Sequence, residues 1–116
     1  MNETSLVRAF TNRGYEIVEP ELFSFPDQIR LFAEADLVVG LGGAGMFNTI
    51  FSPPSTRVVS IESSTDFAHN HADLFGSLGH PFAFIFGAQD PEDTTPVQKR
   101  WTIDVKETMK AIRQYE

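Results

Sequence analysis

Apolar residues follow two different patterns in successive segments of the chain. In residues 4–13 they recur at helical spacing, and Gly14 follows as a stop signal. In residues 36–40 (DLVVG) and 82–86 (FAFIF) they instead form short, nearly continuous runs. Runs of this kind are typical of strands that are covered on both faces. The pattern therefore predicts helices that alternate with buried strands.

The same two patterns extend over the whole chain. The expected helices cover residues 4–13, 25–36, 44–51, 70–78 and a last segment from Asp104, and the expected strands cover residues 15–20, 36–40, 57–62 and 82–86. Ser24 with Asp27, and Asp104 with Glu107, have the spacing that caps the start of a helix. Residues 87–98 are polar and contain two prolines, which predicts a surface loop.

This alternation predicts an α/β fold. Buried strands separated by helices favour a three-layer, Rossmann-like domain with a mainly parallel sheet of about four strands. The length of 116 residues suits one domain, which we expect to span residues 1–116. Eleven phenylalanines supply large side chains for its core, in which we also expect Trp101.

Charge and composition exclude several classes of function. The formal net charge of −7 disfavours binding to nucleic acid or to an anionic lipid surface. No apolar run approaches the roughly 20 residues that span a bilayer. The first residues, MNETSL, lack the pattern of a secretory signal, and the absence of cysteine excludes disulfides and thiolate chemistry. We expect a cytoplasmic protein without a membrane span.

The stretch DLVVGLGGAGMFN, residues 36–48, is the main candidate for chemistry. Its glycines satisfy the G-x-G-x-x-G fingerprint, which begins at Gly40 and lies at the carboxyl end of an expected strand. The amide groups from Gly43 to Met46, together with the dipole of the helix that starts there, favour a phosphate group. The alternative is a tight turn whose glycines serve packing alone.

A dinucleotide is one candidate for the phosphate ligand. Glu62 lies about 20 residues after the loop, where an acidic residue holds a ribose. However, about 35 residues precede the motif, whereas a dinucleotide fingerprint normally opens its domain. The helix after the loop is also short, because Pro53 and Pro54 end it. A long helix would favour the dinucleotide, and a short one favours another phosphate ligand.

Four consecutive segments resemble glycosyltransferase family 61, to which bacterial capsular polysaccharide biosynthesis proteins belong. They are NETSLVRAFTNRGYEIVEPE (residues 2–21), LFSFPDQIRLFAEADLVVG (22–40), GGAGMFNTIFSPPST (42–56) and ADLFGSLGHPF (72–82). The third segment is similar to the family pattern H-G-A-G-[LM]-x-N-x-x-F-x-P-P-G-[ST]. The order and spacing of the four segments match the family over most of the chain.

The resemblance implies the donor-binding, C-terminal half of an inverting glycosyltransferase of GT-B architecture, with a nucleotide-sugar as donor and no cofactor or metal required. A carbohydrate acceptor would be held by an N-terminal half outside this chain, so the chain alone is expected to be inactive. An exposed interdomain face would favour self-association. The residues expected to hold the donor nucleotide are Gly42, Gly43, Ala44, Gly45, Met46, Asn48 and Glu62.

The chain departs from the family pattern at three positions. Gly42 stands where the family has a histidine, Ser55 stands where it has a glycine, and Ser60 stands at its acidic position, with Glu62 nearby. The group that takes the proton of the acceptor is therefore not identified. The second candidate function is a non-catalytic nucleotide- or phosphate-binding module or a degenerate fragment, and the third is a small dinucleotide-binding domain.

Other polar residues carry weaker signals. His69 and His71 have the spacing of two metal ligands but lack a third, so we expect no metal. Asp66 and Asp73 are candidate bases near the loop, although carboxylates at such places commonly cap helices or face solvent. His80 is expected to end a turn.

Overall fold

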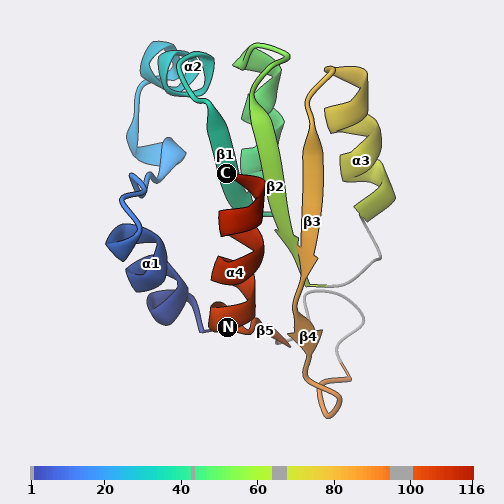
Figure 1. Ribbon diagram of the computed structural model, residues 1–116. Coiled ribbons are helices and arrows are strands. Elements are labelled where there is room, and N and C mark those ends of the chain that lie inside the picture. The colour runs from blue at the N-terminus through green and yellow to red at the C-terminus, as the bar shows by residue number, and fades with distance from the viewer. Residues whose placement is uncertain (1, 43, 64–67, 95–100) are drawn as a thin grey trace. The chain divides into compact units, whose positions relative to one another are not determined.

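The structure is a computed structural model that describes residues 2–42, 44–63, 68–94 and 101–116 (Figure 1). Contacts within the chain divide it into two compact units. Unit 1 combines the two ends of the chain, residues 1–18 and 87–116, and unit 2 is the continuous segment 19–86. The expectation of a single domain over the whole chain stays a prediction.

Unit 2 holds a three-stranded parallel sheet and the elements that connect its strands. In chain order these are η1 (Pro20–Leu22), α2 (Phe25–Ala33), β1 (Leu37–Leu41), η2 (Ala44–Phe51), β2 (Arg57–Glu62), α3 (Ala68–Ser77) and β3 (Phe82–Phe86). The strand order is β1-β2-β3, and Figure 1 shows the three strands running in one direction. The mixed α/β class and the parallel sheet are thus confirmed.

The register of the sheet determines which residues share a face. Val58 pairs with Val38 on one side and with Phe82 on the other. Because successive strand residues point to opposite faces, every second residue shares a face with Val58. This face, called the α3 face below, carries Val38, Gly40, Val58, Ser60, Glu62, Phe82, Phe84 and Phe86.

One core cluster of unit 2 lies on the α3 face, while Val59 and Ile61 are buried on the opposite face. Met46 of η2 and Phe75 of α3 form a buried cluster with Val58, and the half-buried Val38 and Phe84 pack against it. Phe75 is fully buried, and its ring centroid lies 6.0 Å from that of Phe82 and 6.4 Å from that of Phe84. The strand-to-helix connections therefore return onto one face of the sheet, which brings α3 over the ends of β2 and β3.

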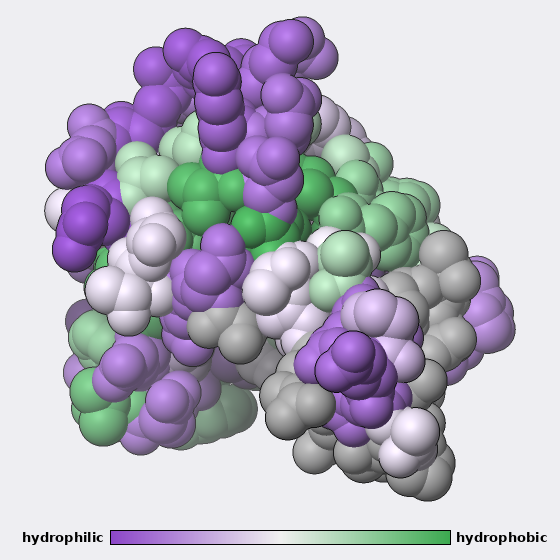
Figure 2. All heavy atoms as spheres, turned by 90° about the horizontal axis from the view of Figure 1, so that it is seen from below, coloured by the Kyte–Doolittle hydropathy of each residue, from purple (hydrophilic) through white to green (hydrophobic). Residues whose placement is uncertain are grey.

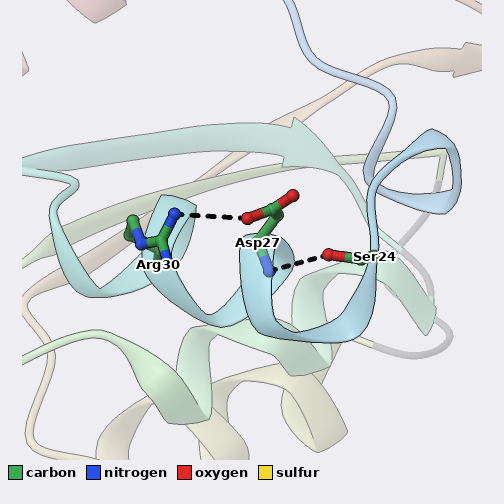
Figure 3. A network of polar contacts seen from close by, with 3 residues as sticks. All are labelled: Ser24, Asp27 and Arg30. Atoms are coloured by element: carbon green, nitrogen blue, oxygen red, sulfur yellow. Dashed lines mark hydrogen bonds and ion pairs between the residues drawn. The ribbon is translucent and has the colours of Figure 1, made fainter.

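The capping predicted for α2 is confirmed. The Ser24 hydroxyl accepts a hydrogen bond from the Asp27 amide at 3.3 Å, and the Asp27 carboxylate pairs with Arg30 at 3.2 Å (Figure 3). The helix ends at Ala33, three residues before the predicted end. Its end is fixed by hydroxyl groups from outside the helix, since Ser52 donates to the carbonyl of Phe32 at 2.6 Å. Free carbonyls at a helix end need such partners.

One strand expected from the sequence is not formed. Residues 15–19 have no regular secondary structure, and Pro20 begins η1 instead. Ile17, in the middle of this segment, is 47% exposed. The segment alternates apolar and acidic residues like an extended strand, but proline at its end removes a donor and no neighbouring strand pairs with it among the described residues.

Two other elements differ from expectation in kind. Residues 44–51 form a helix where one was predicted, but it is a 3-10 helix, which helical spacing alone does not distinguish from an α-helix. Within the predicted loop 87–98, β4 (Ala88–Gln89) pairs antiparallel with β5 (Trp101–Thr102). Trp101, expected in the core, is half-buried beside this short ladder.

Unit 1 is completed by two helices, α1 (Glu3–Asn12) and α4 (Val105–Tyr115). Asp104 caps α4 as predicted, because its carboxylate accepts from the Glu107 amide at 2.9 Å. The ends of the chain are joined directly: the Asn2 side chain donates to the carbonyl of Ile103 at 2.8 Å and accepts from its amide at 3.1 Å. None of the helices in the described part of the chain has the length and apolar character to cross a membrane.

Candidate functional site

The glycine-rich loop follows β1 at the carboxyl edge of the parallel sheet. The ladder continues one residue past β1, because the amide of Gly42 donates to the carbonyl of Ile61 at 2.8 Å. The carboxyl ends of parallel strands are where ligands bind in open α/β sheets. The loop, the end of β2 at Glu62 and the start of η2 thus meet where the sequence predicts a ligand.

Gly40 leaves room for a side chain of η2. A Cβ atom at Gly40 would lie 2.5 Å from Sδ of Met46, a distance that no packed structure tolerates. Met46 is 5% exposed and belongs to the core cluster, so its side chain is directed away from any ligand at the loop. The predicted role of Met46 in ligand binding can therefore involve only its backbone amide.

Gly42 leaves room for the carboxylate of Glu62. A Cβ atom there would lie 2.5 Å from Cδ and 2.7 Å from Oε1 of Glu62. The histidine of the family pattern would not fit at this position while Glu62 keeps its conformation. The space beside the first two glycines of the fingerprint is thus filled by side chains of the chain itself.

Glu62 is the buried centre of a polar group on the α3 face. It is 5% exposed, and its Oε1 accepts a hydrogen bond from the fully buried hydroxyl of Ser60 at 2.9 Å. The same oxygen contacts Nδ1 of His71, which α3 supplies. A buried carboxylate is stable only when partners of this kind replace water. We call Ser60, Glu62 and His71 the carboxylate–imidazole cluster.

The remaining predicted loop residues lie around the start of η2. Ala44 is the first residue of η2, Gly45 follows it and is exposed, and Gly43 lies outside the described residues. A Cβ atom at Gly45 would meet nothing within 4 Å, so this position has open space beside it. Asn48 is half-buried, and its amide donates to Oε1 of Gln28 at 3.5 Å. Asn48 therefore joins η2 to α2, as a supporting residue would.

The other histidines have separate surroundings. His69 is exposed on α3. His80 is buried, and its Nε2 donates to the carbonyl of Thr49 at 3.0 Å, which ties η2 to the start of β3. Asp73 is exposed, and Asp66 lies outside the described residues. Among the residues that the structure describes, no three histidine or acidic side chains gather in a way that would hold a metal ion.

The pairing of His71 with Glu62 was not expected from the sequence, which treated His71 with His69 as a candidate metal ligand. A signal for it does exist. His71 and Phe75 are four residues apart on one helix and therefore share a face. Because Phe75 is a large apolar residue that favours burial, His71 is expected to point inward with it.

Residues 1–59 match the family described as Glycosyltransferase 61. This range contains β1, the glycine-rich loop, η2 and the first residues of β2, and it covers three of the four resembling segments. The fourth, residues 72–82, lies outside it. Neither a curated protein nor a solved structure gave a significant match.

Proposed function

Because the chain belongs to glycosyltransferase family 61, we propose that it binds the nucleotide-sugar donor of an inverting glycosyltransferase, as the C-terminal half of the complete enzyme. The acceptor is a carbohydrate held by the other half, and the product is a polysaccharide of the capsular kind. The reaction requires no metal or cofactor and takes place in the cytoplasm.

The observation that carries this proposal is the family match over the segment that includes the glycine-rich loop. In the reaction, the acceptor hydroxyl oxygen attacks the anomeric carbon of the sugar, and the nucleoside diphosphate leaves from the opposite side. The departing group gains negative charge. Amide groups at the start of η2, those of Gly45 and Met46 among them, stabilise this charge.

Gly45, Asn48 and Glu62 have separate parts in this arrangement. Gly45 supports close approach of the diphosphate, because the space beside it is open. Asn48 holds η2 in place through Gln28. The Oε1 atom of Glu62 is already engaged by Ser60 and His71, which leaves Oε2 to accept a hydrogen bond from a ribose hydroxyl.

A dinucleotide-binding domain is the less favoured function. The helix after the loop ends at Phe51, two residues before Pro53, and is of the 3-10 type. A dinucleotide fingerprint is instead followed by a long crossover α-helix. In addition, Gly40 and Gly42 are explained by the side chains of Met46 and Glu62.

Self-association stays part of the proposal. Figure 2 shows apolar surface, in green, on the face seen from below. Large apolar side chains of unit 2 are exposed, with Leu22 at 75% and Phe25 at 62%. Exposed large apolar side chains favour contacts with another protein surface, which here would be the other half of the enzyme or a second copy.

The donor proposal is tested by titrating the labelled chain with UDP, GDP and NAD while following backbone amide signals. We expect saturable shifts at Gly45 and Met46 with a nucleoside diphosphate and none with NAD. Shifts with NAD that extend to Glu62 would establish the dinucleotide instead. The absence of shifts with all three compounds would refute nucleotide binding by this chain.

A variant with an added negative charge tests whether the diphosphate binds beside Gly45. Gly45→Asp adds a carboxylate where the space is open, so the fold should be kept while the diphosphate is repelled. We expect its dissociation constant to rise about tenfold or more, which corresponds to about 1.4 kcal/mol. Gly76→Asp, on the exposed side of α3, is the matched control because it changes the net charge equally. Equal effects of the two variants would rule out a local site at Gly45.

A further inference from the structure

The carboxylate–imidazole cluster holds a histidine in a defined orientation. Nδ1 of His71 contacts the carboxylate of Glu62, which is itself fixed by Ser60. The side chain of His71 is 12% exposed and that of Glu62 is 6% exposed, so water does not compete freely for this contact. A carboxylate on Nδ1 fixes the imidazole tautomer with the proton on that nitrogen. The lone pair of the neutral ring is then on Nε2.

Nε2 is the ring nitrogen of His71 that does not contact Glu62. Among the described residues no hydrogen bond to this nitrogen is present. The two contacts with Oε1 of Glu62 come from Nδ1 of His71 and from the hydroxyl of Ser60. His80 is the contrasting case in the same unit. Its Nε2 donates to the carbonyl of Thr49, which fixes the opposite tautomer and a structural role.

The cluster also lies next to the glycine-rich loop. Glu62 is the last residue of β2, and its carboxylate occupies the space beside Gly42 that a side chain would otherwise take. His71 reaches the same point from the first part of α3. The imidazole and the loop therefore belong to one edge of the sheet.

We infer that His71 is the general base of this site, with Glu62 as its positioning residue. The inference rests on the proposed function. In the step it serves, Nε2 of His71 takes the proton from the acceptor hydroxyl as the acceptor oxygen bonds to the anomeric carbon. The bond between that carbon and the diphosphate oxygen breaks, and its electron pair leaves with the nucleoside diphosphate. Glu62 stabilises the imidazolium cation that forms.

The three histidines of the chain allow a direct test by imidazole nitrogen NMR on the full chain. We expect the Nδ1-H tautomer for His71, the Nε2-H tautomer for His80, and an averaged, solvent-like signal for His69. Saturating UDP or GDP is expected to shift the Nε2 signal of His71 and to leave those of His69 and His80 unchanged.

An activity measurement uses a variant that keeps the buried contact. His71→Asn retains an amide nitrogen at the place of Nδ1, which can still donate to Glu62, but it lacks the basic Nε2. Where the unaltered chain releases nucleoside diphosphate from UDP-glucose, UDP-N-acetylglucosamine or GDP-mannose, with water as acceptor, the variant is expected to release it at least about 100-fold more slowly. Diphosphate affinity should remain unchanged. His69→Asn, two residues away and exposed, is the matched control with the rate of the unaltered chain.

The outcomes separate this inference from the proposed function. A chain that binds none of the diphosphates refutes both. A chain that binds them while His71 has the Nε2-H tautomer, or while its Nε2 signal does not move, refutes the general base alone. The same holds if His71→Asn releases diphosphate as fast as the unaltered chain. If the unaltered chain releases none, the imidazole signals decide the matter by themselves.

Discussion

Replacing Gly42 with alanine should destabilise unit 2 through the carboxylate of Glu62. The added Cβ would lie 2.5 Å from Cδ of that side chain, far inside van der Waals contact. Glu62 must then turn away and lose its contacts with Ser60 and His71. Hydrogen bonds to charged groups contribute about 1.5–3 kcal/mol each. Because Gly42 is exposed, the displaced carboxylate regains some water, and the expected loss is about 2–4 kcal/mol.

Urea denaturation followed by far-ultraviolet circular dichroism measures this loss as a change in the free energy of unfolding. Gly45→Ala is the matched control, since its Cβ would meet nothing within 4 Å. That variant should change the free energy of unfolding by no more than about 0.5 kcal/mol.

The same substitution in a Glu62→Ala chain shows whether the contact between the added Cβ and Glu62 causes the loss of stability. In a Glu62→Ala chain no carboxylate stands beside residue 42, so adding Gly42→Ala should cost no more than about 0.5 kcal/mol. An equal cost of Gly42→Ala in both backgrounds would refute the reasoning, because the loss would then come from the backbone of the loop.

Three further variants test the packing and the caps. Gly40→Ala forces the Sδ atom of Met46 out of its place, so the free energy of unfolding from thermal melting should fall by about 1–3 kcal/mol. An unchanged melting temperature would mean that Met46 repacks without cost. Phe75→Ala leaves a cavity at the centre of the α3 face, so the free energy of unfolding measured by urea denaturation should fall by about 3–5 kcal/mol. Phe75→Leu, which removes fewer atoms, should lower it by less. Asp104→Ala removes the cap of α4 and should cost about 1 kcal/mol, seen as faster hydrogen exchange of the first α4 amides, including Glu107; equal exchange would show that the cap adds nothing.

The sequence predicted best where local chemistry decides the structure. The bounds of β2 and β3 agree with the strands expected at RVVSIE and FAFIF, because β-branched and aromatic residues favour strands. The caps at Ser24 and Asp104 are equally local, since each hydroxyl or carboxylate bonds an amide three residues on.

It predicted poorly where a distant partner is needed. Residues 15–20 have the alternation of a strand, but a strand forms only if another lies beside it, and that depends on the whole topology. The cluster of Ser60, Glu62 and His71 likewise depends on the sheet register and on how α3 returns to it. The glycines were open to two interpretations for the same reason, because the side chains that fill the space beside Gly40 and Gly42 come from elsewhere.

The joining of the two chain ends in unit 1 has a consequence for biosynthesis. The side chain of Asn2 bonds to Ile103, which is synthesised 101 residues later. At about 5–20 residues per second, a ribosome needs roughly 5–20 s to supply that partner. Until then α1 has no α4 to cover its apolar face, whereas residues 19–86 emerge as one continuous segment. Synthesis from the N-terminus thus favours folding of the sheet before α1 packs against α4. Until α4 is made, the exposed apolar face of α1 is the part of the nascent chain that chaperones would bind.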